Sequence, residues 1–425
     1  MNSDKIFASI ITIGDELLIG QTIDTNSAWM GQQLNNIGIW VKRRVAVGDL
    51  KNDILEALNQ EGKQSDLIFI TGGLGPTADD ITKPLLCEYF GGKMVVNEEA
   101  LENVKTIFEK HLKRPLLPSN LKQAEVPDVC TVILNKRGTA PGMWFTQKDS
   151  GKIYISLPGV PNEMKGMMTD YILPKLPSLF TLPAVVHRTL MTFGIGESFL
   201  AERIKDFETA LPNHIKLAYL PNYGMVKLRL TSTGLNKSEL TSEIDSLFNT
   251  LQDLVKDYLV TNEDKPLQEV VGQILEANKK TMCTAESCTG GFVAHLITST
   301  PGASAYFMGS VVSYDNTVKQ KVLNVSEQTL STFGAVSEET VIQMANGAKS
   351  LLNTDFSLSI SGIMGPDGGS DEKPVGTVWI AVAGPTETIA QKFNLRHNRT
   401  TNIEVTANMA LNMLRMAILK DISLA

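Results

Sequence analysis

Short apolar runs alternate with amphipathic helical patterns over the first 170 residues. The run Ile6–Gly14 is apolar and rich in β-branched residues, which suits a strand buried on both faces of a sheet. A helical pattern over Asn26–Gly38 ends on a glycine, the residue most often found just beyond a helix. Strand patterns follow at 39–48 and 66–70, a helical pattern lies between them at 51–63, and a strand with a turn lies at 151–164. This alternation predicts a doubly wound, mainly parallel α/β sheet.

The pattern changes between residues 171 and 262. A hairpin pattern at 215–234 and an amphipathic helical pattern at 237–260 predict a small α+β module. The polar segment Thr261–Pro266 is typical of a linker, and the α/β alternation resumes after it. We therefore expect an α/β fold class: two doubly wound α/β domains, at 1–170 and 263–425, joined by an α+β module at 171–262.

Composition limits the class of protein. The chain has 425 residues, 43% hydrophobic and 20% charged, which is enough for ordinary cores in several domains. A net charge of −7 and an aromatic content of 6% argue against a general binder of nucleic acid or of membranes. No apolar run approaches the roughly 20 residues that span a bilayer, and no signal-peptide pattern is present. We expect a soluble cytoplasmic protein.

A glycine-rich loop, Thr71–Lys83, follows the strand pattern at 66–70 and opens a helix. Its glycines allow a ligand to approach the backbone, and the helix N-terminus favours an anion such as phosphate. Asp79 and Asp80 suit this site if a divalent cation bridges carboxylate and phosphate oxygens, or if one of them polarises water. The plain alternative is a helix cap, in which the carboxylates serve only the dipole.

Further polar residues are expected at the same edge of this sheet, because ligand sites of parallel sheets gather at the carboxyl ends of the strands. Asp15 and Glu16 follow the first strand, and the turn within 151–164 follows a later one. The candidate metal ligands are Asp15, Glu16, Asp79 and Asp80. The candidate ligand-binding residues are Asn26, Asp49, Gly72 and Gly73.

The stretch Thr284–Gly291 places a serine, a cysteine and a threonine between an apolar strand and a helical pattern. Ser287 lies there beside a helix N-terminus, whose N–H groups can stabilise an oxyanion. A serine hydroxyl is still a weak nucleophile and needs a base. The plain alternative is that Ser287 or Thr289 only caps the helix, and Cys283 is expected to be a buried apolar residue.

Candidate bases follow the next strand. Tyr314 and Lys319 are five residues apart with Asn316 between them, so both side chains can reach one cleft. A desolvated lysine has a lowered pKa and can accept a proton from serine, while tyrosine relays or holds it. The plain alternatives are a solvated lysine and a partly buried ring. The loop Ser361–Gly369 is a candidate anion cradle with Asp367 available for a ribose hydroxyl, or else a simple turn.

Three motifs of the first 170 residues resemble the molybdopterin-binding-like domain of the competence/damage-inducible protein A (CinA) family: GDELLIGQTIDTNSAWMGQQL, TGGLGPTADDITK and LPGVPNEM. The resemblance implies a nucleotide-related pocket and, as in some members, an ADP-ribose pyrophosphatase that needs a divalent metal, Mg or Co, with or without K. It points to Asp49 and Asp80 as the acidic residues of the matching loops, with Asp80 in the catalytic role.

Residues 264–420, with AESCTGG, SVVSYDNTVKQKVLNV and SGIMGPDGG among their motifs, resemble the C-terminal CinA domain. That domain is similar to nicotinamide mononucleotide deamidase, which releases nicotinate mononucleotide and ammonia without a cofactor. The resemblance implies Ser287 as the nucleophile and Tyr314 with Lys319 as its activating pair. The implied substrate-binding residues are Thr289, Gly290, Gly291, Asn316, Gly365, Asp367 and Arg399.

One position departs from the family pattern. Members often carry a second arginine where this chain has Ile403, so Arg396 is the candidate replacement for a phosphate contact. The middle segment resembles a KH-like module but shows no GxxG clamp in the expected setting, which favours a spacer or a homodimer contact over RNA binding. The rival hypothesis is a non-catalytic nucleotide- or molybdopterin-binding protein that acts through partners during competence or DNA damage.

Overall fold

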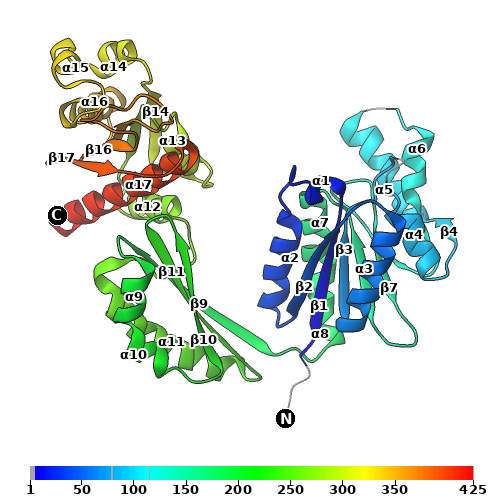
Figure 1. Ribbon diagram of the computed structural model, residues 1–425. Helices are drawn as coiled ribbons and strands as arrows, with labels where there is room; N and C mark the ends of the chain where they lie inside the picture. Colours follow the sequence, from blue (N-terminus) through cyan, green and yellow to red (C-terminus); the bar gives the residue numbers. More distant parts are fainter. Residues whose placement is uncertain (1–4, 78–79, 114, 425) are drawn as a thin grey trace. The chain divides into compact units, whose positions relative to one another are not determined.

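The computed structural model describes residues 5–77, 80–113 and 115–424 (Figure 1). They form two compact units: residues up to 186 together with 232–243, and residues 187–231 together with the chain from 244 onward. Within the described ranges, no helix combines the length and the apolar character that crossing a bilayer requires. The architecture comprises two α/β domains and a small α+β module that lies between them in the sequence, as predicted.

The N-terminal domain is built on a sheet of strand order β2-β1-β3-β8-β7-β6. Its parallel part confirms the predicted doubly wound sheet and consists of β1 (Phe7–Ile13), β2 (Trp40–Val47), β3 (Leu67–Thr71) and β8 (Ile153–Leu157). The antiparallel strands β7 (Gly142–Thr146) and β6 (Thr131–Ile133) extend it at one edge, which the apolar pattern did not predict. A separate antiparallel pair, β4 (Met94–Val96) and β5 (Glu125–Pro127), was also not predicted.

Helices cover both faces of this sheet. They are α1 (Asp15–Leu18), α2 (Thr25–Asn36), α3 (Lys51–Gln64), α4 (Thr82–Tyr89), α5 (Glu98–Thr106), α6 (Pro118–Leu121), α7 (Pro161–Met167) and α8 (Leu173–Leu179). Successive strand residues face opposite sides, so Ile10 shares a core cluster with Leu34 of α2, while Ile11 shares one with Leu58 of α3. Burial on both faces explains why β1 and β3 are continuous apolar runs.

The middle module has a four-stranded sheet of order β10-β11-β9-β12. Its strands are β9 (Ala184–Phe193), β10 (Ile215–Asn222), β11 (Met225–Gly234) and β12 (Leu259–Thr261). Its helices are α9 (Glu197–Arg203), α10 (Lys205–Thr209) and α11 (Lys237–Val255). The predicted hairpin is present, but the long helix ends at Val255 and the chain continues into β12.

The C-terminal domain has a five-stranded sheet of order β14-β13-β15-β16-β17. The strands β13 (Met282–Glu286), β14 (Phe307–Val312) and β15 (Phe356–Gly362) are parallel, and β16 (Thr377–Ala383) and β17 (Thr388–Asn394) are antiparallel. The helices are α12 (Leu267–Ala277), α13 (Phe292–Thr298), α14 (Asn316–Leu323), α15 (Glu327–Phe333), α16 (Glu338–Leu352) and α17 (Arg399–Leu424). The sheet is therefore mixed, and its parallel strands are the ones that carry the candidate motifs.

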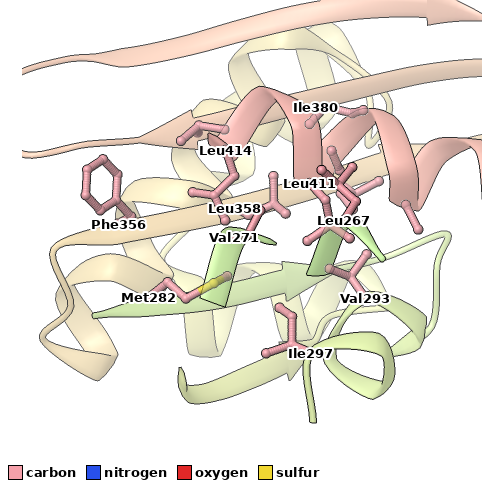
Figure 2. Packing of buried hydrophobic residues seen from close by; sticks show 14 of the residues in the cluster. Leu267, Val271, Met282, Val293, Ile297, Phe356, Leu358, Ile380, Leu411 and Leu414 are labelled. Atoms are coloured by element: carbon pink, nitrogen blue, oxygen red, sulfur yellow. The ribbon is translucent and has the colours of Figure 1, made fainter. Parts of the chain in front are cut away.

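Two helical layers enclose this sheet. Figure 2 shows Leu411 and Leu414 of α17 packed with Leu358 of β15 and with Val271 of α12. On the opposite face, Cys283 joins a cluster with residues of α16, which confirms its expected role as a buried apolar residue. Each layer buries one set of alternating strand positions, and the strand ends remain free for loops that carry function.

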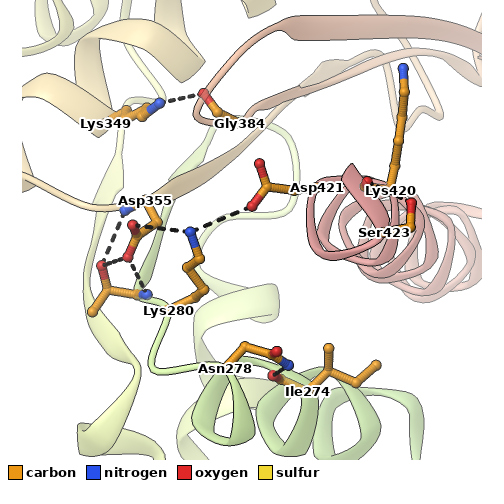
Figure 3. Close-up of polar contacts among 10 residues, drawn as sticks. Ile274, Asn278, Lys280, Lys349, Asp355, Gly384, Lys420, Asp421 and Ser423 are labelled. Atoms are coloured by element: carbon orange, nitrogen blue, oxygen red, sulfur yellow. Dashed lines mark hydrogen bonds and ion pairs between the residues drawn. The ribbon is translucent and has the colours of Figure 1, made fainter. Parts of the chain in front are cut away.

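Ion pairs tie the amino end of the parallel strands to the last turns of α17. Lys280 Nζ lies 3.5 Å from a carboxylate oxygen of Asp421 and 3.9 Å from one of Asp355 (Figure 3). Asp355 also accepts hydrogen bonds from the amide and hydroxyl of Thr281, at 2.8 and 2.9 Å. These partly exposed charges lie at the end of the strands opposite the one that carries the candidate motifs.

The packing of α16 on α14 predicts an unusual response to alanine. A Cβ at Gly347 would lie 1.9 Å from the Leu323 carbonyl oxygen, whereas one at Gly31 in α2 would meet only a methyl group of Val41 at 3.9 Å. We expect Gly347→Ala to destabilise the protein by about 1–3 kcal/mol and Gly31→Ala to stabilise it by about 0.5–1 kcal/mol. Urea unfolding of both variants checks this, and equal gains in stability would contradict the described contact.

Candidate active site

The candidate residues of the C-terminal domain meet at the carboxyl ends of its parallel strands. Ser287 directly follows β13, Tyr314 lies two residues beyond β14, and the loop Ser361–Gly369 begins as β15 ends. They surround a cavity of about 270 Å³. Its wall includes Ser287, Cys288, Tyr314, Asn316, Lys319, Ser361, Met364, Gly365, Asp367 and Arg399. Parallel strands thus bring together groups that are far apart in the sequence.

Ser287 and Lys319 are in direct contact. Lys319 Nζ lies 3.2 Å from Ser287 Oγ, and it donates to the carbonyl oxygens of Ser313 at 2.8 Å and of Tyr314 at 3.1 Å. Lys319 is 1% exposed and Ser287 is 8% exposed. The plain alternative of a solvated lysine is therefore wrong for Lys319.

The surroundings of Lys319 disfavour the charged form of its amine. Burial lowers the pKa of Lys319, and the Asp315 carboxylate only partly opposes this effect. Among the described residues no carboxylate lies within ion-pair distance of Lys319 Nζ, and Asp315 instead accepts the Thr317 amide at 2.7 Å as the cap of α14. A neutral amine has two N–H groups for the two carbonyls and a lone pair for the Ser287 hydroxyl.

Cys288 borders the same cavity but is a poor competitor for the nucleophilic role. Burial raises the pKa of the Cys288 thiol to about 12, so the thiol stays protonated at neutral pH. The Ser287 hydroxyl, by contrast, already has a buried amine within hydrogen-bond distance. Of the two adjacent side chains, serine is the candidate nucleophile.

The start of α13 does not offer the free amides that the sequence suggested. The buried Glu286 carboxylate accepts hydrogen bonds from the amides of Gly291, Val293 and Ala294 at 2.9–3.1 Å. It also accepts the Thr289 hydroxyl at 2.7 Å. The predicted oxyanion site at this helix N-terminus is therefore wrong, because a side chain of the protein already occupies it.

The predicted substrate loop has a structural role in this arrangement. Gly290 and Gly291 adopt positive φ angles of 62° and 96° in the turn between Ser287 and α13. Neither they nor Thr289 belong to the wall of the cavity, and the Thr289 hydroxyl points to Glu286. Sequence reasoning missed Glu286, although a single carboxylate at the end of an apolar strand was a visible signal.

Tyr314 contacts Lys319 through its backbone, not through its phenol. Its side chain is 65% exposed, and its hydroxyl accepts a hydrogen bond from Arg399 at 3.3 Å. Arg399 also donates to the Gly365 carbonyl at 2.7 Å. No hydrogen bond joins the phenol to Ser287 or Lys319 among the described residues, so the geometry does not support the expected proton relay through Tyr314.

The cavity wall carries charged and polar side chains, which are those of Arg399, Asp367 and Asn316. Arg399 forms no ion pair with any described carboxylate, and Asp367 and Asn316 are exposed. Arg396 is not part of the wall, and Ile403 packs against the core, so Arg399 is the arginine that borders the cavity. The cavity thus combines a candidate nucleophile and a candidate base with a cation that an anionic ligand can neutralise.

The N-terminal domain holds a second cavity, of about 430 Å³, at the carboxyl edge of its parallel strands. Gly72, Gly73 and Asp80 of the glycine loop border it, together with Glu16 and Asp49. Gln123 and Glu163 also border it, and the sequence analysis did not select them. Burial raises the pKa of the Glu163 carboxyl, against a weaker opposite effect of its hydrogen bond from Asn135. This edge is where the sequence placed a ligand site.

Most acidic residues of this edge already bind the protein's own backbone. Asp80 accepts the amides of Gly75 at 2.8 Å and of Thr77 at 2.9 Å, so it holds the glycine loop in shape. Asp15 and Asp49 exchange hydrogen bonds, each carboxylate accepting the other's amide, at 3.1 and 3.3 Å.

Asn26 has a structural role and does not belong to the wall of the second cavity. Its side-chain amide donates to the Thr71 hydroxyl at 3.2 Å and to the Gly159 carbonyl at 2.7 Å. It therefore ties the end of β3 to the turn that follows β8.

The expected metal ligands do not form a metal site in the described part of the chain. There, no group of three or more His, Cys, Asp or Glu side chains is placed to hold an ion. Asp79, one of the four candidates, lies outside the described residues. The hydrogen bonds of Asp15 and Asp80 explain the result, because their oxygens face backbone amides rather than a common point.

Comparison with known proteins gives matches over all three parts of the chain. Family models match at 9–178 (probable molybdopterin binding domain), 187–261 (damage-inducible protein CinA KH domain) and 264–418 (CinA C-terminal domain). A CinA-like protein from Cytophaga hutchinsonii is 46% identical over 410 residues, which are 96% of this chain and 97% of that protein. A putative competence-damage inducible protein from Acetivibrio thermocellus is 40% identical over 97% of this chain and 99% of its own. A crystal structure of a CinA protein of unknown function from Thermoplasma acidophilum is 38% identical and covers 39% of this chain and 94% of its own, with a TM-score of 0.36.

Proposed function

This chain belongs to the CinA family, and from that premise we propose that its C-terminal domain is a serine amidohydrolase. Its proposed substrate is nicotinamide mononucleotide, whose carboxamide would be hydrolysed to give nicotinate mononucleotide and ammonia. The observation that carries the proposal is the contact of Ser287 Oγ with the buried amine of Lys319, at 3.2 Å. A hydroxyl beside an amine whose pKa is lowered by burial is the combination that amide cleavage needs.

The proposed reaction begins with Lys319 Nζ taking the proton of Ser287 Oγ. The oxygen forms a bond to the carboxamide carbon, and the carbonyl electron pair moves to oxygen. The resulting intermediate expels ammonia when Lys319 returns the proton to the leaving nitrogen, which leaves an ester on Ser287. Water, deprotonated by Lys319, then cleaves this ester, and serine and the neutral amine are regenerated. The nucleophile and the base are both protein groups, so the proposal requires no cofactor.

The rest of the cavity suits a mononucleotide. Arg399 supplies a guanidinium that two neutral oxygens hold in place, and a phosphate can accept from its remaining N–H groups. Asp367 provides a carboxylate for ribose hydroxyls on the same wall. These two residues support a phosphorylated nucleoside over a simple amide.

The first test of this proposal is ammonia release from nicotinamide mononucleotide. We expect Ser287→Ala and Lys319→Arg each to lower kcat by about 10³-fold or more, because the first lacks the nucleophile and the second cannot give up its proton. Cys288→Ala, the matched control on the neighbouring wall residue, is expected to stay within a few-fold of wild type. Full activity of Ser287→Ala would falsify the assignment.

We propose ADP-ribose pyrophosphatase activity as the function of the N-terminal domain. The supporting observation is the cavity of about 430 Å³ over the glycine loop, at the edge of the sheet where such ligands bind. Gln123, buried at this cavity, has a side-chain oxygen without a hydrogen-bond partner in the protein. The described carboxylates do not fit a resident divalent metal, so no step is assigned to one.

The N-terminal proposal predicts that the full chain converts ADP-ribose to AMP and ribose 5-phosphate. Asp80→Asn is expected to lower this rate at least about tenfold, because an amide cannot accept from both Gly75 and Thr77 through two equivalent oxygens. Ser287→Ala should leave the rate unchanged. The assay is run with Mg²⁺, with Co²⁺ and with chelator. Saturable binding of ADP-ribose without turnover in all three would favour the rival, a non-catalytic binding protein.

A further inference from the structure

The Glu286 carboxylate is one of the most completely hydrogen-bonded groups of the C-terminal domain. It is 0% exposed and lies directly before the candidate nucleophile. One oxygen accepts the Thr289 hydroxyl and the amides of Gly291 and Val293, at 2.7–3.1 Å. The other accepts the Ala294 amide at 2.9 Å and the Thr284 hydroxyl at 3.3 Å. No lysine, arginine or histidine among the described residues forms an ion pair with it.

A buried carboxylate is energetically costly, and α13, whose first amides it binds, has only seven residues. Serine and aspartate at the cap position are the common solution, and the same domain uses it for α14 and α15. The Glu286 carboxylate instead binds the Thr289 hydroxyl and the Gly291 amide, which follow Ser287 in the same loop. This placement indicates a role in holding the loop.

The loop is fixed on both sides of Ser287. The Ser287 amide donates to the Ile360 carbonyl at 2.9 Å, and the Ser287 carbonyl accepts the Gly290 amide at 3.1 Å. The Glu286 carbonyl accepts the Ser313 amide at 2.8 Å, which joins the loop to the segment that holds Lys319. Backbone and side chain of Glu286 thus enclose residues 287–290.

Two amides remain unused after these bonds are counted. In the described C-terminal residues, the N–H groups of Cys288 and Thr289 donate to no oxygen of the protein. Cys288 borders the cavity next to Ser287, and its neutral thiol adds no negative charge there. The oxyanion forms on the carbonyl oxygen of the carboxamide that Ser287 attacks, so a donor directly beside Ser287 is placed to reach it.

We infer that Glu286 is a positioning residue of the active site: it occupies the amides at the start of α13 and holds the Ser287 turn so that the amide of Cys288, which borders the cavity, serves as an oxyanion donor. This inference rests on the proposed amidase function. The oxyanion develops only in the transition state, so loss of these contacts lowers kcat and leaves KM nearly unchanged.

The test compares Glu286→Gln with Ser326→Ala in the full chain. Ser326 caps α15 through a bond to the Thr329 amide at 3.0 Å and therefore reports the effect of a lost cap away from the cavity. We expect Glu286→Gln to lower kcat for nicotinamide mononucleotide by about 10²–10³-fold with KM within about threefold. The NH₂ group of glutamine cannot accept the hydrogen bonds that one carboxylate oxygen of Glu286 accepts. Ser326→Ala is expected to keep kcat. Equal kcat in folded Glu286→Gln and wild type would overturn the inference.

A second substitution keeps the test decisive if Glu286→Gln fails to fold. Replacing Cys288 by its α-hydroxy acid removes the N–H beside Ser287 and keeps the thiol side chain. We expect this change to lower kcat at least about tenfold, and an unchanged kcat would refute the oxyanion assignment. Wild type that releases no ammonia, or active Ser287→Ala, would instead refute the amidase proposal, so the two failures are distinguishable.

Discussion

A buried amine without a counter-ion is the constraint on which the C-terminal site depends. Lys319 lies among two backbone carbonyls and one hydroxyl, at 1% exposure, where an ammonium would lose its hydration and gain no carboxylate. The cost of that burial falls on the charged form, so the same packing that excludes water also makes the amine a base. The packing of Lys319 and its reactivity are therefore linked. Hydrogen bonds fix both ends of α14, from the Thr317 amide to Asp315 and from the Val325 amide to the Lys319 carbonyl.

Glu286 is a second buried titratable side chain of this domain, and its surroundings differ from those of Lys319. Its carboxylate oxygens are compensated by amides and hydroxyls. Glu286 ends β13, and Lys319 lies on α14 after the neighbouring strand β14. The two groups form no ion pair within the described residues. An ion pair would hold Lys319 in its charged form, and separate compensation of Glu286 avoids this.

The apolar pattern predicted the parallel strands and their helices well, because burial on both faces leaves a continuous signal. It missed β6, which has three residues, and β17, which is partly exposed. It also missed β7, which is buried but antiparallel and so lies outside the strand–helix alternation. The contact of Ser287 with Lys319 was predictable because both follow neighbouring parallel strands.

The direction of the Tyr314 side chain was not predictable, because spacing fixes backbone position but not rotamer. The acidic residues of the N-terminal loops were also ambiguous. A sequence does not distinguish a carboxylate that faces a ligand from one that, like Asp80, binds its own loop.

The most direct measurement is the titration of the Lys319 amine itself. Side-chain NMR of isotope-labelled lysine, assigned with a Lys319→Arg spectrum, follows its protonation from pH 6 to 11. Burial disfavours the charged form, so the account predicts a midpoint below the ordinary lysine value of about 10.4 and a rise of kcat/KM for ammonia release with the same midpoint. A Lys319 amine that stays charged up to pH 10 in an active enzyme would contradict the account.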